Sequence, residues 1–329
     1  MQDILTCAMG LDIHRDVIVA CLAKGELGTD PEIEIRSFST LIPEMRKLRD
    51  WVLEAECRYV AMESTGIYWQ PIYEMLEPCF DGQINILVVN ARHMKNVPGR
   101  KTDMRDAQWI ATLLRAGLLK GSFIPDKTFR ELRHLTRYRK SIVRDITAQK
   151  NRIDKFLQSS GFRFTAFLSD AFGASGRNII RHLMEYGNIS REALDRCLKT
   201  QTRKRIDEIL IALNGSLSEH QRGFLRMIFG HLEALEQHRH TVEDAITKEI
   251  TKHEEALSLL CSIPGIDVTA AAAIIAEIGT DMSAFPDSQH ICSWAGLSPG
   301  NNESAGKRKS AHINKGNPYL KSMLCEVGW

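Results

Sequence analysis

The chain has 329 residues, with 43 Lys and Arg against 41 Asp and Glu. This length allows two or three domains with substantial cores, and 43% hydrophobic with 26% charged residues is the composition of an ordinary globular protein. This composition argues against disorder. No apolar run approaches the ~20 residues of a membrane-spanning helix, which argues against membrane insertion. Eight cysteines without a CxxC pair, and no signal peptide, predict reduced thiols in a cytoplasmic protein.

The first 125 residues alternate between strand and helix patterns. Strands are expected at 4–14, 16–23, 32–38, 58–64 and 84–90, and helices at 42–56, at 67–79 and from Asp103 onward. The first two strands form a hairpin, and alternating units follow. This order predicts an α/β domain with a mixed sheet flanked by helices.

Two acids fall on predicted strands of this domain. Asp12 lies in the first strand, two residues after the small Gly10. Glu63 lies at the carboxyl end of the apolar strand at 59–62, where the binding residues of open α/β sheets gather. Both carboxylates are therefore candidate site residues.

Two further acids open the helix that begins at Asp103. Thr102 is its expected N-cap, and Asp106 shares a face with Ile110 and Leu113 at i, i+4 and i+7. That face should point toward the sheet. Asp103 alone is equally explained as a first-turn acid that complements the helix dipole.

Four converging carboxylates would repel one another unless hard cations neutralised them. Oxygen ligands of this kind suit Mg²⁺, with Mn²⁺ as an alternative. The other interpretation is that each acid is a helix cap or part of a core ion pair.

These acids lie in three short segments, GLDIHRD, AMESTG and KTDMRDA. The segments resemble the RNase H-like (RuvC-like) domain of the DEDD transposases of the insertion sequence 110 family. The resemblance extends to their order and spacing. It implies that Asp12, Glu63, Asp103 and Asp106 bind Mg²⁺. It also implies that a structured guide RNA selects target and donor DNA, and that dimers assemble into a tetramer at the nucleoid.

A basic stripe follows the first domain. From Asp126 to Lys155 there are ten Lys and Arg against four acids, which suits contact with several phosphates. The alternative is a merely solvated face. The candidate phosphate contacts, including those around the acids, are Arg100, Lys101, Arg105, Arg130, Arg133, Arg137, Lys140 and Arg144.

Two heptad seams, at 132–156 and 225–246, predict two long helices in an all-α coiled-coil region. They could form an antiparallel hairpin or an intermolecular coiled coil. The insert between them, at 157–217, has no assigned chemistry, although its KTQTRKR patch could touch nucleic acid. The expected domains are 1–125, 126–254 and 255–329.

The last domain opens with CSIPGIDVTAAAAIIAEIG, which has the form of a helix-hairpin-helix whose Pro-Gly turn could present N–H groups to a phosphate. A purely structural helical hairpin fits equally well. The following run, FPDSQHICSWAGLSPGNNESAGKRKSAHINKGNPYLK, resembles the transposase domain of the same family. The chain ends in the opening turns of a helix, and family members continue further, so we expect a truncated copy.

Ser304 lies in this run, followed by the cations Lys307, Arg308, Lys309 and Lys315, which are candidate DNA-backbone contacts. Polar Ser-Gly loops are usually only turns. The family resemblance, however, implies that Ser304 attacks DNA to form a phosphoserine intermediate. The sequence reads Ser-Ala-Gly where some relatives read Ser-Gly, and Ser310 is the second candidate nucleophile.

These features predict an RNA-guided DNA transposase or recombinase. One alternative is a metal-dependent RNase H-like nuclease or junction resolvase that uses water as its nucleophile. Another is a non-catalytic nucleic-acid-binding protein or an inactive truncated copy.

Overall fold

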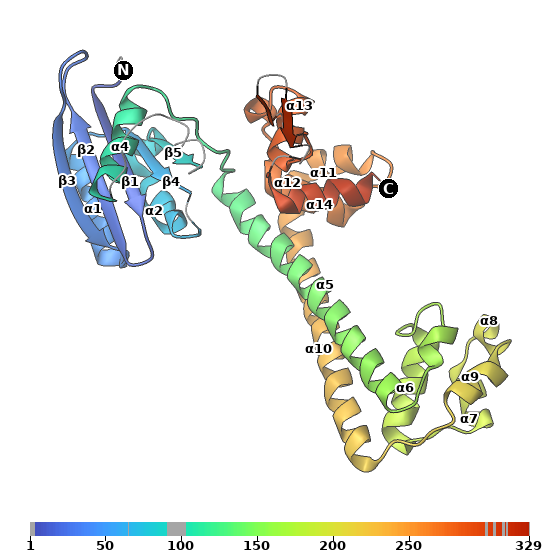
Figure 1. Ribbon diagram of the computed structural model, residues 1–329. Coiled ribbons are helices and arrows are strands. Elements are labelled where there is room, and N and C mark those ends of the chain that lie inside the picture. Colours follow the sequence, from blue (N-terminus) through green and yellow to red (C-terminus); the bar gives the residue numbers. More distant parts are fainter. Residues whose placement is uncertain are drawn as a thin grey trace. The chain divides into compact units, whose positions relative to one another are not determined.

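The computed structural model describes residues 4–64, 66–90, 103–299, 302–304, 307–310, 313 and 315–328, with the backbone alone at 103–105, 302–304 and 307–310. The chain divides into two compact units, Met1–Ile124 and Pro125–Trp329, which are taken separately below (Figure 1). Among the described residues, no helix combines the length and the apolar character needed to cross a membrane.

The first unit is a five-stranded sheet with helices. In chain order its elements are β1 (Cys7–Ile13), β2 (Val17–Lys24), β3 (Glu32–Ser39), α1 (Ile42–Glu54), β4 (Tyr59–Glu63), α2 (Trp69–Leu76), the 3-10 turn η1 (Cys79–Gly82), β5 (Asn85–Val89) and α4 (Asp103–Arg115). The strand order is β3-β2-β1-β4-β5; β1, β2 and β3 are antiparallel neighbours, and β1, β4 and β5 are parallel. The predicted mixed sheet is confirmed, and its topology agrees with an RNase H-like domain.

Strand pleating divides this unit into two layers of packing. Met9, Leu11 and Ile13 of β1 join a cluster with residues of α1 and α2. The alternate residue Ala8 belongs to a separate cluster with Ile110 and Leu114. These two residues lie on α4, which covers one face of the sheet (Figure 1). Because successive side chains of a strand point to opposite faces, Gly10 and Asp12 lie on the same face of β1 as Ala8, the face that α4 covers.

The second unit is almost entirely helical. Its elements are α5 (Lys127–Ser159), η2 (Phe164–Phe167), α6 (Ala174–Tyr186), α7 (Arg191–Cys197), α8 (Thr200–Arg203), α9 (Ile206–Ala212), α10 (Glu219–Ile250), η3 (Thr251–His253), α11 (Glu254–Cys261), α12 (Val268–Ile278), η4 (Met282–Ala284), α13 (Ser288–Ala295), the strands β6 (Asn302–Ser304) and β7 (Lys307–Ser310), and α14 (Pro318–Val327). A mainly helical part after the sheet domain was expected.

The long helices α5 and α10 pack against each other within one chain. The rings of Phe156 and Phe224 are 5.0 Å apart, and at the other end Arg139 Nη2 lies 2.7 Å from Glu243 Oε1. The partners run in opposite directions along the two helices, so the pair is antiparallel. The seam residues Leu132, Ile142, Ile146, Leu225 and Leu232 are buried in this core, whereas coiled-coil geometry as such stays a prediction.

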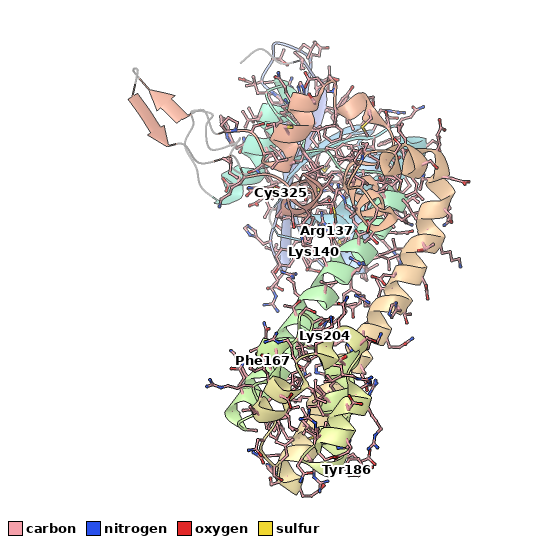
Figure 2. All side chains as sticks on the ribbon, turned by 90° about the vertical axis from the view of Figure 1, so that its right-hand side faces the viewer. Arg137, Lys140, Phe167, Tyr186, Lys204 and Cys325 are labelled. Carbon is pink, nitrogen blue, oxygen red and sulfur yellow. The ribbon has the colours of Figure 1, made fainter. Side chains whose placement is uncertain are left out.

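The two ends of the α5–α10 pair carry different structures. Helices α6, α7 and α9 pack together with η2 where α5 ends and α10 begins, a lobe marked by Phe167, Tyr186 and Lys204 in Figure 2. Helix α12 packs on the first turns of α5, α11 and α14 pack on α12, and α13 packs on α14. The predicted insert at 157–217 is therefore a small helical lobe.

Candidate metal centre and serine hairpin

Asp12 and Glu63 occupy equivalent places on neighbouring strands. The parallel ladder pairs Leu11 of β1 with Met62 of β4, so Asp12 and Glu63 are the next residues of the two strands. Ala61 packs with α4 residues, and pleating places Glu63 on the same face as Ala61. Both carboxylates thus lie on the sheet face that α4 covers.

Gly10 lets α4 approach β1 closely at this point. A methyl group on Gly10 would lie 2.2 Å from the carbonyl oxygen of Ala107 and 2.4 Å from the amide nitrogen of Ala111. Such contacts are impossible, so only glycine fits. Asp106 directly precedes Ala107, so it is held close to β1 near Gly10. Asp12 lies two residues after Gly10 on the same strand.

The pKa of Asp12 is affected by two of the other predicted ligands. Asp12 is 6% exposed, and burial raises its pKa. His14, whose Nε2 lies 3.2 Å from Asp12 Oδ2, lowers this pKa, whereas the negative charges of Asp106 and Glu63 raise it. Three of the four predicted ligands are therefore close enough to interact across one face of the sheet.

The fourth predicted ligand, Asp103, is the first residue of α4, but its side chain lies outside the described residues, as do Thr102, Arg100, Lys101 and the side chain of Arg105. Among the described side chains, no group of three or more His, Cys, Asp and Glu is gathered tightly enough to enclose a metal ion. The donor set nevertheless fits a hard cation, because all members offer carboxylate oxygens and the negative charges of Asp106 and Glu63 raise the pKa of Asp12.

Replacing Gly10 with alanine is expected to destabilise the first unit by about 1–3 kcal/mol or more, because the new methyl group would displace the backbone of α4. Thermal unfolding of the full chain measures this. The control is Gly230→Ala in α10, where an added Cβ meets nothing within 4 Å and the helix should gain slightly. Equal stability of the two variants would contradict close packing at Gly10.

Ser304 and Ser310 lie on a small hairpin of the second unit. Ser304 is the last residue of β6, paired with Lys307 of β7, and Ser310 pairs with Asn302. The side chains of both serines and of Lys307, Arg308 and Lys309 lie outside the described residues, while Lys315 is exposed. The predicted nucleophile is thus on a two-stranded hairpin that belongs to a different unit from the acids.

Residues 9–161 match a DEDD family of IS110 described as "Transposase", and residues 257–329 match the "Transposase IS116/IS110/IS902 family". The chain belongs to the IS110 family of transposases. The first match contains all four predicted acids, and the second contains Ser304.

Two curated relatives of this IS110-family transposase have similar sequences. A protein of Sinorhizobium fredii named as a transposase, y4qE, is 22% identical over 70% of the chain and 47% of its own length. An uncharacterized 43.6 kDa protein of the insertion element IS110 from Streptomyces coelicolor is 28% identical over 69% of the chain and 60% of its own length. The chain thus spans about half the length of the curated relatives it matches.

Three arginines of the basic stripe in this transposase make internal contacts. Arg130 is buried and its Nη1 donates to the carbonyl of Pro125 at 3.0 Å. Arg137 forms two parallel 2.8 Å hydrogen bonds to Glu277, which is only 2% exposed, and Arg133 Nε lies 3.1 Å from the same carboxylate. The sequence interpretation missed Glu277, although it is the one acid in the otherwise apolar helix VTAAAAIIAEI.

Burial and partner charge affect the two arginines differently. Burial lowers the pKa of Arg133 to about 10, and Glu277 opposes that shift. Burial also lowers the pKa of Arg137, but the hydrogen bonds and charge of Glu277 outweigh it, so the pKa is raised overall. Both guanidinium groups stay charged at neutral pH, so they neutralise Glu277.

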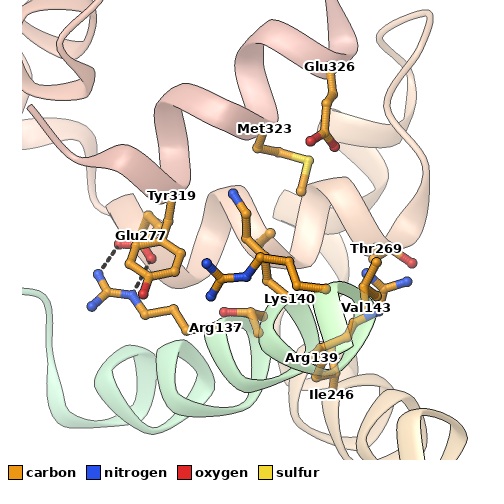
Figure 3. A pocket seen from close by; sticks show the side chains of 13 residues that line it. Arg137, Arg139, Lys140, Val143, Ile246, Thr269, Glu277, Tyr319, Met323 and Glu326 are labelled. Carbon is orange, nitrogen blue, oxygen red and sulfur yellow. Dashed lines mark hydrogen bonds and ion pairs between the residues drawn. The ribbon is translucent and has the colours of Figure 1, made fainter. Parts of the chain in front are cut away.

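Lys140 and Arg144 remain the stripe residues placed to meet a ligand. Both line a pocket of about 220 Å³, together with Thr269 of α12 and Tyr319 and Met323 of α14 (Figure 3). Figure 2 places Arg137 and Lys140 on the same stretch of α5. The predicted nucleic-acid contact of α5 is therefore reduced to Lys140 and Arg144, on the side of the helix that lines the pocket.

Helices α11 and α12 are joined by the Pro-Gly turn expected from the sequence. Gly265 has φ +88°, which favours glycine, and Asp267 caps α12 by accepting from the amide of Ala270 at 2.7 Å. Two helices joined by a tight turn are therefore present at this place. Whether the turn acts as a helix-hairpin-helix toward phosphate stays a prediction.

Proposed function

We propose that the chain cuts and rejoins DNA during transposition, through a serine-linked intermediate formed at a divalent metal site. The observation that supports this most directly is the placement of Asp12, Glu63 and Asp106 on the sheet face that α4 covers, where the negative charges of Glu63 and Asp106 raise the pKa of Asp12. Membership of the IS110 family supports transposition as the biological reaction.

Asp12, Glu63, Asp103 and Asp106 would hold Mg²⁺ or Mn²⁺. When bound, such an ion promotes ionisation of a hydroxyl and neutralises charge on phosphate oxygens. The described surroundings suit this role: Asp12 is buried, and His14 lowers its pKa while the charges of Asp106 and Glu63 raise it.

In the proposed reaction, the Ser304 hydroxyl attacks a DNA phosphorus. The Oγ–P bond forms, the bond from phosphorus to one DNA oxygen breaks, and that oxygen leaves as a hydroxyl carrying the serine proton. Attack by a DNA hydroxyl on the phosphoserine reverses these steps and restores Ser304. The number of phosphodiester bonds is conserved, so strands can be exchanged without an external energy source.

Target DNA, donor DNA and a structured guide RNA are the proposed partners. Base pairing with the RNA would select the sequence, while Lys140, Arg144, Lys315 and the cations of β7 contact phosphates. Recombination of two duplexes needs several cuts, so we propose a homo-oligomer, a dimer that assembles into a tetramer. The proposed place of action is the cytoplasm, at the nucleoid.

A second candidate function is a metal-dependent nuclease that uses water. The acids and Ser304 lie in separate units. The first unit alone therefore contains the four acids that such a nuclease would use, which is the observation in favour of this second function. In that case DNA is cut, but no protein–DNA bond forms.

The two functions are separated by a covalent trapping experiment. The full chain, together with RNA transcribed from its own insertion element, is incubated with Mg²⁺ and nicked DNA that releases a short fragment after cleavage. Protease digestion and mass spectrometry should then find a nucleotide on the peptide that contains Ser304. Cleavage without an adduct would establish the nuclease, and a nucleotide on Ser310 would move the nucleophile.

A further inference from the structure

The segment that carries Ser304 begins and ends at one place on the helical unit. At its base, Asn317 N donates to the carbonyl of Trp294 at 2.8 Å, and Pro299 and Ile313 form a bridge. Gly316 lies so close that an added Cβ would be 2.2 Å from the amide nitrogen of Gly296. The residues before and after the hairpin are therefore packed backbone against backbone.

Both sides of this base connect to the buried carboxylate of Glu277. On the following side, Asn317 Nδ2 donates to Glu277 Oε2 at 2.6 Å. On the preceding side, the guanidinium of Arg133 lies over the Trp294 ring at 5.8 Å, while its Nε donates to the carbonyl of Ala276 at 2.9 Å. Glu277 thus joins the base of the hairpin to α5 and α12.

Arg137 completes this arrangement. Its fork of two hydrogen bonds fixes the Glu277 carboxylate, and its guanidinium lies 4.3 Å from the centre of the Tyr319 ring on α14 (Figure 3). A bidentate Arg–carboxylate pair has one preferred geometry. Since Glu277 is 2% exposed, water cannot compete effectively for its oxygens.

We propose that Glu277, held by Arg133 and Arg137, is the positioning residue that anchors both ends of the hairpin carrying Ser304. This inference deepens the proposed function and rests on it for the role of Ser304. Arg133 and Arg137 then act through Glu277 and do not contact DNA phosphates. Anchoring restricts the directions in which the hairpin can present a nucleophile to DNA.

The Asn317→Ser variant tests the anchor without removing the buried ion pair. Asn317 is also the N-cap of α14, where its Oδ1 accepts from the amides of Tyr319 and Leu320 at 2.9 and 3.2 Å. Serine is an equally good N-cap, but its side chain is too short to reach Glu277. Asn317→Ser should therefore fold. Glu277→Gln is a less suitable test, because it leaves two arginines facing a neutral group and could prevent folding.

Hydrogen exchange of the full chain without DNA gives the first readout. We expect amides of residues 302–310 to exchange about tenfold faster in Asn317→Ser than in the wild type, because a hydrogen bond to a buried charge is lost. The matched control is Glu243→Gln, which breaks the ion pair of Arg139 between α5 and α10 and should leave these amides unchanged. If these amides exchange in Asn317→Ser at the same rate as in the wild type, the proposal is overturned.

Adduct formation gives the second readout. With saturating DNA, Asn317→Ser should form the Ser304 adduct about tenfold more slowly, with an unchanged apparent KM for DNA, since neither Asn317 nor Glu277 needs to touch DNA. A purely structural role predicts a normal rate in the folded fraction, which would overturn positioning. If the wild type forms no adduct, the proposed nucleophile fails, and the exchange result alone decides the anchor.

Discussion

Ser304→Ala is expected to abolish covalent attachment of the chain to cleaved DNA, lowering adduct yield by at least about 10³-fold. Alanine has no hydroxyl, so no bond from the side chain to phosphorus can form. The measurement is the yield of protein-linked DNA on a denaturing gel after trapping, at equal occupancy of RNA and DNA. Cleavage should be lost together with the adduct, because both arise in the same step.

Ser310→Ala is the matched control for this prediction. Ser310 lies on the partner strand of the same hairpin and pairs with Asn302, so its loss perturbs the same structure without removing the proposed nucleophile. It should retain the adduct. An adduct that survives Ser304→Ala and disappears in Ser310→Ala would assign the chemistry to Ser310, while survival in both would place the nucleophile elsewhere.

The sheet domain could be predicted well from the sequence because its signals are local. Alternating apolar residues define β1, β2 and β3, and the short apolar runs of β4 and β5 stand between helical patterns. The face of α4 was also predictable, since Ile110 and Leu113 are buried at the positions that helical periodicity gives. Register could not be predicted, and it is register that aligns Asp12 with Glu63.

The basic stripe shows where sequence reasoning reached its limit. A pattern reveals the charge of Arg133 and Arg137, but their partner Glu277 is 144 and 140 residues away along the chain. Long-range ion pairs of this kind have no periodic signal. A lone acid within an alanine-rich apolar helix was the available hint, because a buried carboxylate needs a partner.

The two heptad seams were compatible with an antiparallel hairpin or with an intermolecular coiled coil. In the structure most of their apolar residues are buried between α5 and α10 of one chain. Gln149 breaks the first seam, yet it is 2% exposed, and its Nε2 donates to the carbonyl of Ile228 on α10 at 2.7 Å. A polar residue in a seam is thus satisfied by the backbone of the facing helix. Phe229 is 1% exposed and packs in this core, although the heptad spacing of the second seam, through Leu225, Ile228 and Leu232, does not include it.

Asp12→Asn is expected to reduce adduct formation by about 10²–10³-fold or more, since an amide is a much weaker ligand for a hard cation than a carboxylate. The measurement is the single-turnover rate of adduct formation with Mg²⁺ at saturating DNA. Asp16→Asn is a suitable control, because Asp16 is an exposed acid in the turn that follows β1. Full activity of Asp12→Asn would contradict the metal site.

The same variant should be more stable than the wild type when metal is absent. The pKa of Asp12 is raised in the folded unit, so the ionised side chain destabilises the fold, and this penalty develops as pH rises through the folded pKa. Asparagine resembles the protonated form and avoids the penalty at neutral pH. The ion pair between the buried Asp12 and the largely exposed His14 is also lost, but burial affects the pKa of Asp12 more strongly than His14 does.

Metal should reverse this order of stability. At about 100 times its Kd, Mg²⁺ or Mn²⁺ stabilises a folded protein by about 2.7 kcal/mol, and Asp12→Asn should lose most of that gain. Thermal unfolding is therefore expected to give a higher Tm for Asp12→Asn than for the wild type without metal, and a lower Tm than the wild type with metal. If Asp12 were only a structural partner of His14, the variant would have the lower Tm both with and without metal. A variant that is more stable without metal and less stable with metal therefore identifies Asp12 as a metal ligand.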